Sequence, residues 1–214
     1  MKKGRLLILG ASGHGKVAGD CARAAGFWSE LVFYDDRWPA QNMCGSWPVV
    51  GTGETLLVEY RKNDQGFVAI GNAATRLAWL QRISSAGIPL ATIKHPRAIL
   101  SVGVTLGAGS LVVAGAVVNI DVRVGKGCII NTGSSVDHDC VLADGVHICP
   151  GAHLAGEVQI GTSSWIGIGS SVCQCIRIGN VVTVGAGAVV TENVPDGITV
   201  IGVPARPQTK HKLD

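Results

Sequence analysis

The chain beyond residue 96 follows a strict period of six. From residue 100 to residue 190, every sixth side chain is aliphatic, without a break. This period fits neither an α-helix nor a β-meander and is typical of a β-helix, in which each hexad forms a short strand and its turn. Three hexads would complete one coil, so residues i and i+18 would stack around a narrow aliphatic core. The sixteen positions are Leu100, Leu106, Val112, Val118, Val124, Ile130, Val136, Leu142, Ile148, Leu154, Ile160, Ile166, Val172, Ile178, Val184 and Val190.

The repeat also explains an unusual composition. The 214 residues include 30 glycines, and only 15% are charged and 5% aromatic. Nine of the ten aromatic residues precede residue 80, and residues 96–190 carry only nine charged side chains. A narrow core needs few aromatic side chains, and glycine permits unusual backbone angles at the corners of a coil. The unusual composition is therefore confined to the second half of the chain, and the first half has the composition of an ordinary α/β domain.

Several classes of function are excluded at this stage. No run of about 18 apolar residues could span a bilayer, and a net charge of +3 is too small to indicate a nucleic-acid partner. The seven cysteines and the lack of a secretion signal predict reduced thiols and a cytoplasmic protein. Cys149, Cys173 and Cys175 invite a zinc site, but their spacing follows the packing positions of the hexads. No metal is therefore expected.

Residues 1–95 are predicted to form a Rossmann-like domain. A buried strand at 6–9 is followed by the glycine-rich segment Gly10-Ala-Ser-Gly-His-Gly15 and a helix to residue 25. Such a turn places backbone N–H groups where a phosphate could bind. A second strand at 31–34 ends in Asp35-Asp36, where an acidic residue commonly meets ribose hydroxyls. A third strand at 67–70 leads through Gly71-Asn72 into a helix that ends near residue 85.

Together these motifs resemble one family. The hexad pattern is that of the left-handed β-helix acyltransferases, and the remaining motifs are similar to the sialic acid O-acetyltransferase type. One branch of this type acetylates nucleotide-linked 4-amino sugars. The resemblance spans essentially the whole chain. It rests on Gly10–Gly15, Asp35-Asp36, Ile70-Gly-Asn72, His95-Pro96, Asn131-Thr132, Val136-Asp-His-Asp-Cys140, His147 and Gly202-Val-Pro-Ala-Arg206.

The resemblance implies a fold and partners. It implies a Rossmann-like nucleotide-sugar-binding domain at 1–95 and a left-handed parallel β-helix at 96–214. It also implies a homotrimer, with acetyl-CoA as the acetyl donor in the groove between neighbouring β-helices. The product would enter the biosynthesis of a glycan.

His138 is the candidate general base. Transfer of an acetyl group to an amine needs a group that takes the proton of the amine, and an imidazole is largely neutral near pH 7. His138 lies in Asp137-His138-Asp139, the densest charge cluster of the repeat region. The resemblance makes Asp139 its partner, although the family often has Glu there. Adjacent strand residues point to opposite faces, so the pair must lie at a bend to touch.

Further site residues follow from stacking and from the resemblance. Gly156 is one coil beyond His138, and His147 is half a coil away, so it could share a cleft with His138 only across a subunit boundary. The resemblance places Gly156 and His147 at the thioester end of CoA, with Ile168 and Ala186 further along it. The family has glycine at the position of Ala186. The predicted contacts with the nucleotide sugar are Gly13, His14, Gly15, Asp35, Asp36, Arg37, Gly71, Asn72 and Asn131, with Arg37 toward a phosphate and Asn131 toward the sugar.

The leading hypothesis is an acetyl-CoA-dependent N-acetyltransferase that acts on the 4-amino group of a nucleotide-linked amino-deoxy sugar. The nucleotide is expected to be UDP, with GDP as the alternative. Three other functions stay open on the sequence alone: O-acetylation of sialic acid or another sugar, a metal-dependent lyase of the γ-carbonic anhydrase type, and a scaffold without activity. The histidine spacings of nine and six residues disfavour the lyase, and a scaffold would leave His138 without a role.

Overall fold

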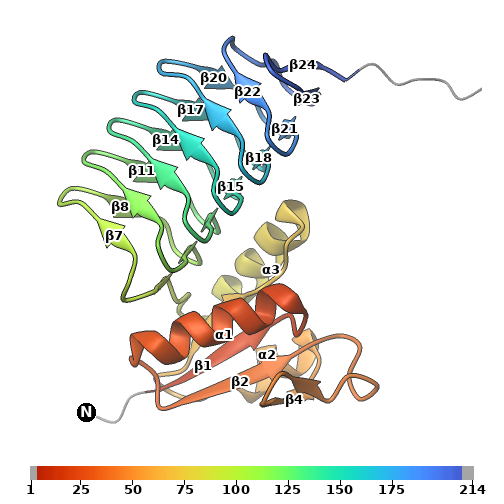
Figure 1. Cartoon of the computed structure of the whole chain (residues 1–214). Coiled ribbons are helices and arrows are strands. Elements are labelled where there is room, and N and C mark those ends of the chain that lie inside the picture. Colours follow the sequence, from red (N-terminus) through yellow and green to blue (C-terminus); the bar gives the residue numbers. More distant parts are fainter. Residues whose placement is uncertain (1–3, 209–214) are drawn as a thin grey trace, which may run out of the picture.

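The computed structural model describes residues 4–208 and divides into an α/β domain and a β-helix (Figure 1). The residues at the two ends of the predicted domains, 1–3 and 209–214, lie outside the described part. The predicted fold class is confirmed: the N-terminal domain is Rossmann-like, and a left-handed parallel β-helix follows it. None of the helices in residues 4–208 is both long enough and apolar enough to cross a membrane.

The N-terminal domain is built around five strands in the order β3-β4-β2-β1-β5. These strands are β1 (Arg5–Leu9), β2 (Glu30–Tyr34), β3 (Met43–Cys44), β4 (Trp47–Gly51) and β5 (Gln65–Val68). Strand β1 pairs in parallel with β2 on one side and with β5 on the other. The strand order therefore reverses at β1, because β2 to β4 lie on one side of it and β5 lies on the other. In sheets of this kind, ligands bind beyond the carboxyl ends of the strands where the order reverses.

Helices cover both faces of this sheet. Helix α1 (Gly13–Ala25) packs Ala18, Cys21 and Ala22 against one face, and α2 (Gly53–Glu59) and α3 (Ala73–Ser85) cover the other. Helix α2 and the hairpin of β3 and β4 were not predicted from the sequence. The Thr52 side chain accepts a hydrogen bond from the Thr55 backbone N–H in a capping box, and this local signal marks the start of α2.

The β-helix consists of short strands in three sheets, which are parallel except that β24 runs antiparallel to β23. Sheet I contains β7, β10, β13, β16, β19 and β22, and sheet II contains β8, β11, β14, β17 and β20. Sheet III contains β6, β9, β12, β15, β18, β21, β23 and β24. The bounds are β6 (Ile93–Lys94), β7 (Ile99–Leu100), β8 (Thr105–Leu106), β9 (Leu111–Val112), β10 (Val117–Val118), β11 (Arg123–Val124), β12 (Ile129–Ile130), β13 (Ser135–Val136), β14 (Val141–Leu142), β15 (His147–Ile148), β16 (His153–Leu154), β17 (Gln159–Ile160), β18 (Trp165–Ile166), β19 (Ser171–Val172), β20 (Arg177–Ile178), β21 (Thr183–Val184), β22 (Val189–Val190), β23 (Thr199–Ile201) and β24 (Arg206–Pro207).

Pairing within the sheets follows the predicted stacking of residues 18 apart. In sheet I, Val118 pairs with Val136, Val136 with Leu154 and Leu154 with Val172. All sixteen aliphatic residues of the hexad series lie in one axial core, buried or partly buried. In strands β7 to β22 the second residue points into this core, and the first residue therefore points outward.

The two parts of the chain share a continuous contact. Strand β6 pairs with β9, so sheet III of the β-helix begins at Ile93. Leu111 and Val113 on the outside of sheet III join the same core as α1, and Figure 1 shows α1 and α3 on the side of the domain nearest the β-helix. The outer surface of sheet III is therefore the surface against which the N-terminal domain docks.

Candidate functional site

The carboxyl ends of β1, β2 and β5 surround a hollow of about 180 Å³. Its lining includes Gly10 and Ser12 after β1, Asp35 and Asp36 after β2, and Ile70 and Gly71 after β5. The Ser12 side chain makes no capping hydrogen bond to α1, and the first N–H groups of a helix have no partner within the helix. The structure thus brings three of the predicted nucleotide contacts, Asp35, Asp36 and Gly71, into the lining of one hollow, beside a helix N-terminus that suits an anion.

The glycines at this hollow are of two kinds. A Cβ at Gly15 would lie 2.2 Å from the Gly10 carbonyl oxygen, so close packing of the loop on the helix requires this glycine. A Cβ at Gly13 or Gly71, in contrast, would meet no atom within 4 Å. Packing does not explain these two glycines, and the free space beside them is where a bound nucleotide could approach the backbone.

The polar residues of the hollow hold its walls together. Asp35 accepts a hydrogen bond from the Ala11 backbone N–H at 2.8 Å, and the Arg37 guanidinium forms a fork on the same carboxylate. Chiefly because of the Arg37 hydrogen bonds, the pKa of Asp35 falls to about 2. Asp36 accepts from the Gly53 backbone N–H, and Asn72 caps α3 through the Thr75 backbone N–H. Arg37 was predicted to face a phosphate, and in this structure it faces Asp35.

His138 and Asp139 form a hydrogen-bonded pair at the turn between β13 and β14. The distance from His138 Nδ1 to Asp139 Oδ2 is 2.8 Å. Asp139 has a φ of 60°, a left-handed conformation that puts the two consecutive side chains on the same side of the bend. The hydrogen bond to Asp139, with smaller contributions from neighbouring carboxylates, raises the pKa of His138. A carboxylate on Nδ1 orients the ring so that Nε2 is the nitrogen available to a substrate.

The stacking of coils supports this pair from both sides. A Cβ at Gly156 would lie 2.5 Å from both Cε1 and Nε2 of His138, so the imidazole rests directly over this glycine. On the preceding coil, Asn119 Nδ2 donates to Asp137 Oδ1 at 2.7 Å, and the same oxygen accepts from the His138 backbone N–H. Asn119 was not singled out in the sequence, although its spacing of 18 from Asp137 is a signal that could have identified it.

A second histidine lies between the two domains. His147, on the outside of β15, is only 7% exposed. Its ring centroid is 6.4 Å from that of His14 and 4.2 Å from that of Trp165, and its Nε2 is 3.2 Å from Asn131 Nδ2. The cluster thus joins three predicted site residues with Trp165, which sequence reasoning left unassigned although it is the single aromatic residue of the repeats.

Burial makes both histidines of this cluster poor bases. Desolvation, aided by the charge of Arg76, lowers the pKa of His14 to about 4. Desolvation, His14 and Arg76 lower the pKa of His147 to about 3. Within residues 4–208, His14 Nε2 and His147 Nδ1 are buried and have no hydrogen-bond partner. Neutral imidazoles with a free ring nitrogen can donate or accept a hydrogen bond to a ligand, whereas exposed His138 is better placed to take a proton.

Of the predicted CoA residues, Gly156 shares a corner of the β-helix with His138, and the other three lie elsewhere. His138 and Gly156 lie on turns between sheets I and II. Ile168 and Ala186 are exposed and stack on turns between sheets III and I, and His147 belongs to sheet III. The axial core separates His138 from His147 in one chain. Among the described residues, no group of three His, Cys, Asp or Glu side chains is placed to hold a metal ion.

The comparisons with known proteins agree with this architecture. Residues 5–83 match the model of the PglD N-terminal domain. The chain is similar to the acetyltransferase domain of PglB from Neisseria gonorrhoeae, solved with acetyl coenzyme A. The two share 42% identity and a TM-score of 0.93, with 96% of this chain and 100% of that chain covered. Among curated proteins, no sequence matches the chain.

Two further structures are comparably similar over their whole length. PerB from Caulobacter crescentus, solved with CoA and GDP-perosamine, is 36% identical with a TM-score of 0.91, covering 96% of this chain and 98% of that chain. WeeI from Acinetobacter baumannii is 29% identical with a TM-score of 0.89, covering 95% of this chain and 99% of that chain. The chain therefore belongs to the family of nucleotide-sugar acetyltransferases that combine a PglD-type N-terminal domain with a hexapeptide-repeat β-helix.

Proposed function

We propose that the protein is an acetyl-CoA-dependent N-acetyltransferase that acts on the 4-amino group of a nucleotide-linked amino-deoxy sugar. The observation that carries this proposal is the His138–Asp139 pair, with the imidazole lying over the bare backbone of Gly156. The pair supplies a base in the densest charged cluster of the repeats, and the glycine leaves room for the imidazole to lie against the backbone of the next coil. A relative with 36% identity is solved with CoA and GDP-perosamine, an amino sugar joined to a nucleotide.

The chemistry needs a base that is neutral when the amine arrives. A sugar amine near neutral pH is mostly an ammonium ion and must lose a proton before it can attack a thioester. His138 Nε2 takes that proton, and Asp139 stabilises the imidazolium that results. The amine nitrogen then forms a bond to the acetyl carbon and the C–S bond breaks. The second proton that this nitrogen loses goes to the departing CoA sulfur, and the imidazolium returns the first proton to solvent. The transfer is direct, without an acyl-enzyme.

Charge that develops on the acetyl oxygen needs a hydrogen-bond donor. The Gly156 backbone N–H and the His147 imidazole are the candidates, as the residues nearest the thioester in the proposed complex. His147 is suited to this role because burial keeps it neutral. Ile168 and Ala186, exposed on stacked turns, would contact CoA further along the groove.

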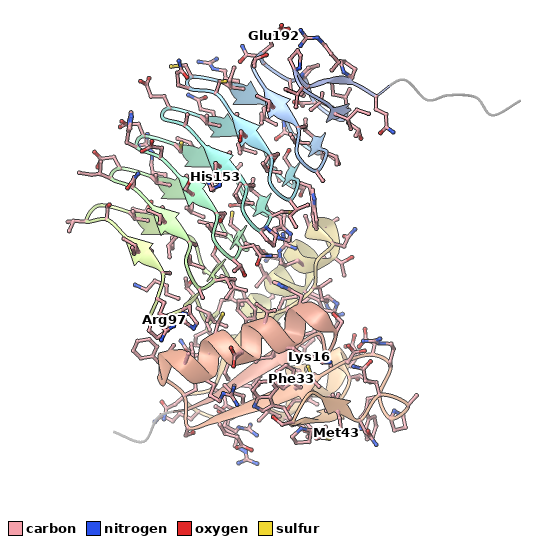
Figure 2. The ribbon with its side chains drawn as sticks, in the orientation of Figure 1. Lys16, Phe33, Met43, Arg97, His153 and Glu192 are labelled. Atoms are coloured by element: carbon pink, nitrogen blue, oxygen red, sulfur yellow. The ribbon has the colours of Figure 1, made fainter. Side chains whose placement is uncertain are left out.

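The proposed active site is assembled from two copies of the chain. His138 and Gly156 lie at one corner of sheet I, Ile168 and Ala186 lie at the other corner, and His147 lies beyond it in sheet III. A groove that holds all of them requires sheet I of one copy to face a neighbour. The outward side chains of sheet I include no Asp, Glu, Lys or Arg, and Figure 2 shows His153 among them on the outside of the β-helix. Sheet II instead presents Arg123 and Arg177. We expect a trimer with three such grooves.

The hollow of the N-terminal domain is the proposed nucleotide site. The bare backbone at Gly13 and Gly71 and the start of α1 at His14 and Gly15 would receive the phosphates. Asp35 and Asp36 lie at the ribose side of the hollow, and Asn131 would face the sugar from the β-helix. UDP is the expected nucleotide, and GDP is the alternative because of the relative that holds GDP-perosamine. The protein would work in the cytoplasm, in the biosynthesis of a glycan.

Release of free CoA tests this function directly. The assay supplies acetyl-CoA with UDP- and GDP-linked 4-amino-4,6-dideoxyhexoses and, as the matched control, the same nucleotide sugars with a 4-hydroxyl group. Release of CoA with an amino sugar, together with a product heavier by one acetyl group, is the expected outcome. Turnover of the hydroxyl compound alone, or of none of the panel, would refute N-acetylation of these sugars.

A further inference from the structure

Arg76 is a buried cation that crosses the boundary between the two domains. It lies in the first turn of α3 and is 1% exposed, yet none of the predicted roles involves it. Its guanidinium donates to four backbone carbonyls. Nη1 donates to Ile70 and Gly71 at 2.7 and 2.8 Å, Nε to Gly127 at 2.7 Å and Nη2 to Gly145 at 2.8 Å.

A charge in this position is costly and is not explained by packing. Among residues 4–208, no carboxylate lies within ion-pair distance of Arg76. A buried charge without a counterion loses the energy of hydration, and an apolar side chain of similar volume is often at least as stable. Desolvation lowers the pKa of Arg76 to about 10, so it stays charged at neutral pH. The reason for an arginine here must lie in what its hydrogen bonds connect.

The four carbonyls belong to the two halves of the proposed active site. Ile70 and Gly71 line the nucleotide hollow. Gly127 and Gly145 are turn residues of successive coils, with φ of 61° and 72°. Gly145 lies two residues before His147, so one guanidinium ties the wall of the nucleotide hollow to the turn that leads into the acetyl end of the site.

We propose that Arg76 is a positioning residue that fixes the nucleotide hollow relative to the acetyl-transfer site. This inference rests on the proposed function. The planar guanidinium holds carbonyls in three directions at once, which the single ammonium of a lysine cannot do. A misplacement of about 1 Å between bound reactants can cost about 100-fold in rate, so the distance between nucleotide and thioester needs a rigid connection. Arg76 provides this rigid connection by binding backbone carbonyls of both domains, and it does so without using side chains that contact either ligand.

The test compares Arg76→Lys and Arg76→Gln with Leu77→Ala. Leu77 packs on the same Gly127 and Gly145 turns, so its truncation weakens the domain contact without touching the bonds to Ile70 and Gly71. Steady-state kinetics would give KM for each substrate, calorimetry Kd for UDP, GDP and acetyl-CoA, and hydrogen exchange the protection of residues 70–72. Arg76→Lys keeps the positive charge and a long aliphatic side chain, so it provides the measurement if Arg76→Gln does not fold.

For both Arg76 variants we expect kcat/KM for the nucleotide sugar to fall by about 100-fold. The acetyl-CoA Kd should stay within about twofold of wild type, and residues 70–72 should exchange faster. Leu77→Ala should lower Tm while kcat/KM and exchange at 70–72 stay near wild type. Arg76 variants that lose only Tm, as Leu77→Ala does, would overturn the proposal. If the wild type acetylates none of the sugars, the proposed function fails. Hydrogen exchange at residues 70–72 and the Kd for UDP and GDP, compared between the Arg76 variants and the wild type, still test whether Arg76 holds the nucleotide hollow in place.

Discussion

His138 owes its proposed role to the conformation of the single residue that follows it. The left-handed φ of Asp139 lets two consecutive side chains meet, and the resulting hydrogen bond raises the pKa of the imidazole. A base must be unprotonated to act, so kcat should fall as pH drops through this raised pKa. A neighbouring carboxylate therefore strengthens the base and at the same time moves its working range toward higher pH.

Asp139→Asn should separate these two effects. Without the carboxylate, the pKa of His138 returns toward its ordinary value near 6.5, so the acidic limb of the kcat profile should move to lower pH. The plateau should fall because the base is weaker. Profiles from pH 5.5 to 9 measure both changes. Asp121→Asn is the matched control, because Asp121 has the same φ of 60° one coil earlier. An acidic limb that stays in place in Asp139→Asn would show that His138 is not the titrating base.

The open space at Gly13 offers a test of the nucleotide site. A Cβ there meets no atom, and alanine is a better helix former than glycine, so Gly13→Ala should fold with an unchanged or higher Tm. Its KM for the nucleotide sugar should rise by about tenfold or more, since a clash of that kind costs at least about 1.4 kcal/mol of binding. KM for acetyl-CoA is the internal control. An unchanged KM for the nucleotide sugar would place the phosphates elsewhere.

At the scale of secondary structure, the site depends on the stacking of turns 18 residues apart. Gly156 lies under His138 because both occupy the same position in successive coils. In Gly156→Ala, the added methyl would have to push the imidazole aside. We expect kcat to fall by about 100-fold, the effect of a displaced base, with little change in Tm. Gln174→Ala, at the same turn position one coil further on, is the control and should retain most of kcat. Full activity of Gly156→Ala would contradict the proposed geometry.

The elements show how much the sequence could predict. The hexad series predicted the axial core and its register, because an unbroken period leaves one way to bury the aliphatic side chains. The strands and helices around Gly10, Asp35 and Gly71 were also predicted, because turn residues mark their ends. The hairpin of β3 and β4 was missed, since two short strands around Gly45 carry too few residues for a periodic pattern.

The contact between the two domains could not be predicted from local sequence patterns. Arg76 reads in the sequence as one more polar residue of an exposed helix, and only the fold shows its guanidinium against the turns at Gly127 and Gly145. The neighbourhood of His14 and His147 likewise depends on how a helix of one domain docks on sheet III of the other. Such pairings are set by tertiary packing and leave no spacing signal in the chain.

At the scale of the whole molecule, the proposed active site forms only when chains associate. Ser171 lies on the outside of sheet I, and Gln159 lies on the outside of sheet II. Ser171→Glu should place repeated like charges in the interface of the proposed trimer and dissociate it, whereas Gln159→Glu should leave it intact. Sedimentation velocity gives the mass, and CoA release under the same conditions gives the activity. A wild-type monomer with full activity, or an active Ser171→Glu monomer, would refute a site shared between subunits.

The proposed mechanism depends above all on removal of the proton of the sugar amine by His138, and His138→Ala is the variant that tests this step. The measurement pairs kcat, from CoA release at saturating nucleotide amino sugar, with the Kd for acetyl-CoA from calorimetry. Loss of a general base predicts a fall in kcat of at least about 100-fold, with the acetyl-CoA Kd unchanged because the exposed imidazole is not needed for the fold. Near-normal kcat in a correctly folded His138→Ala protein would show that His138 is not the general base.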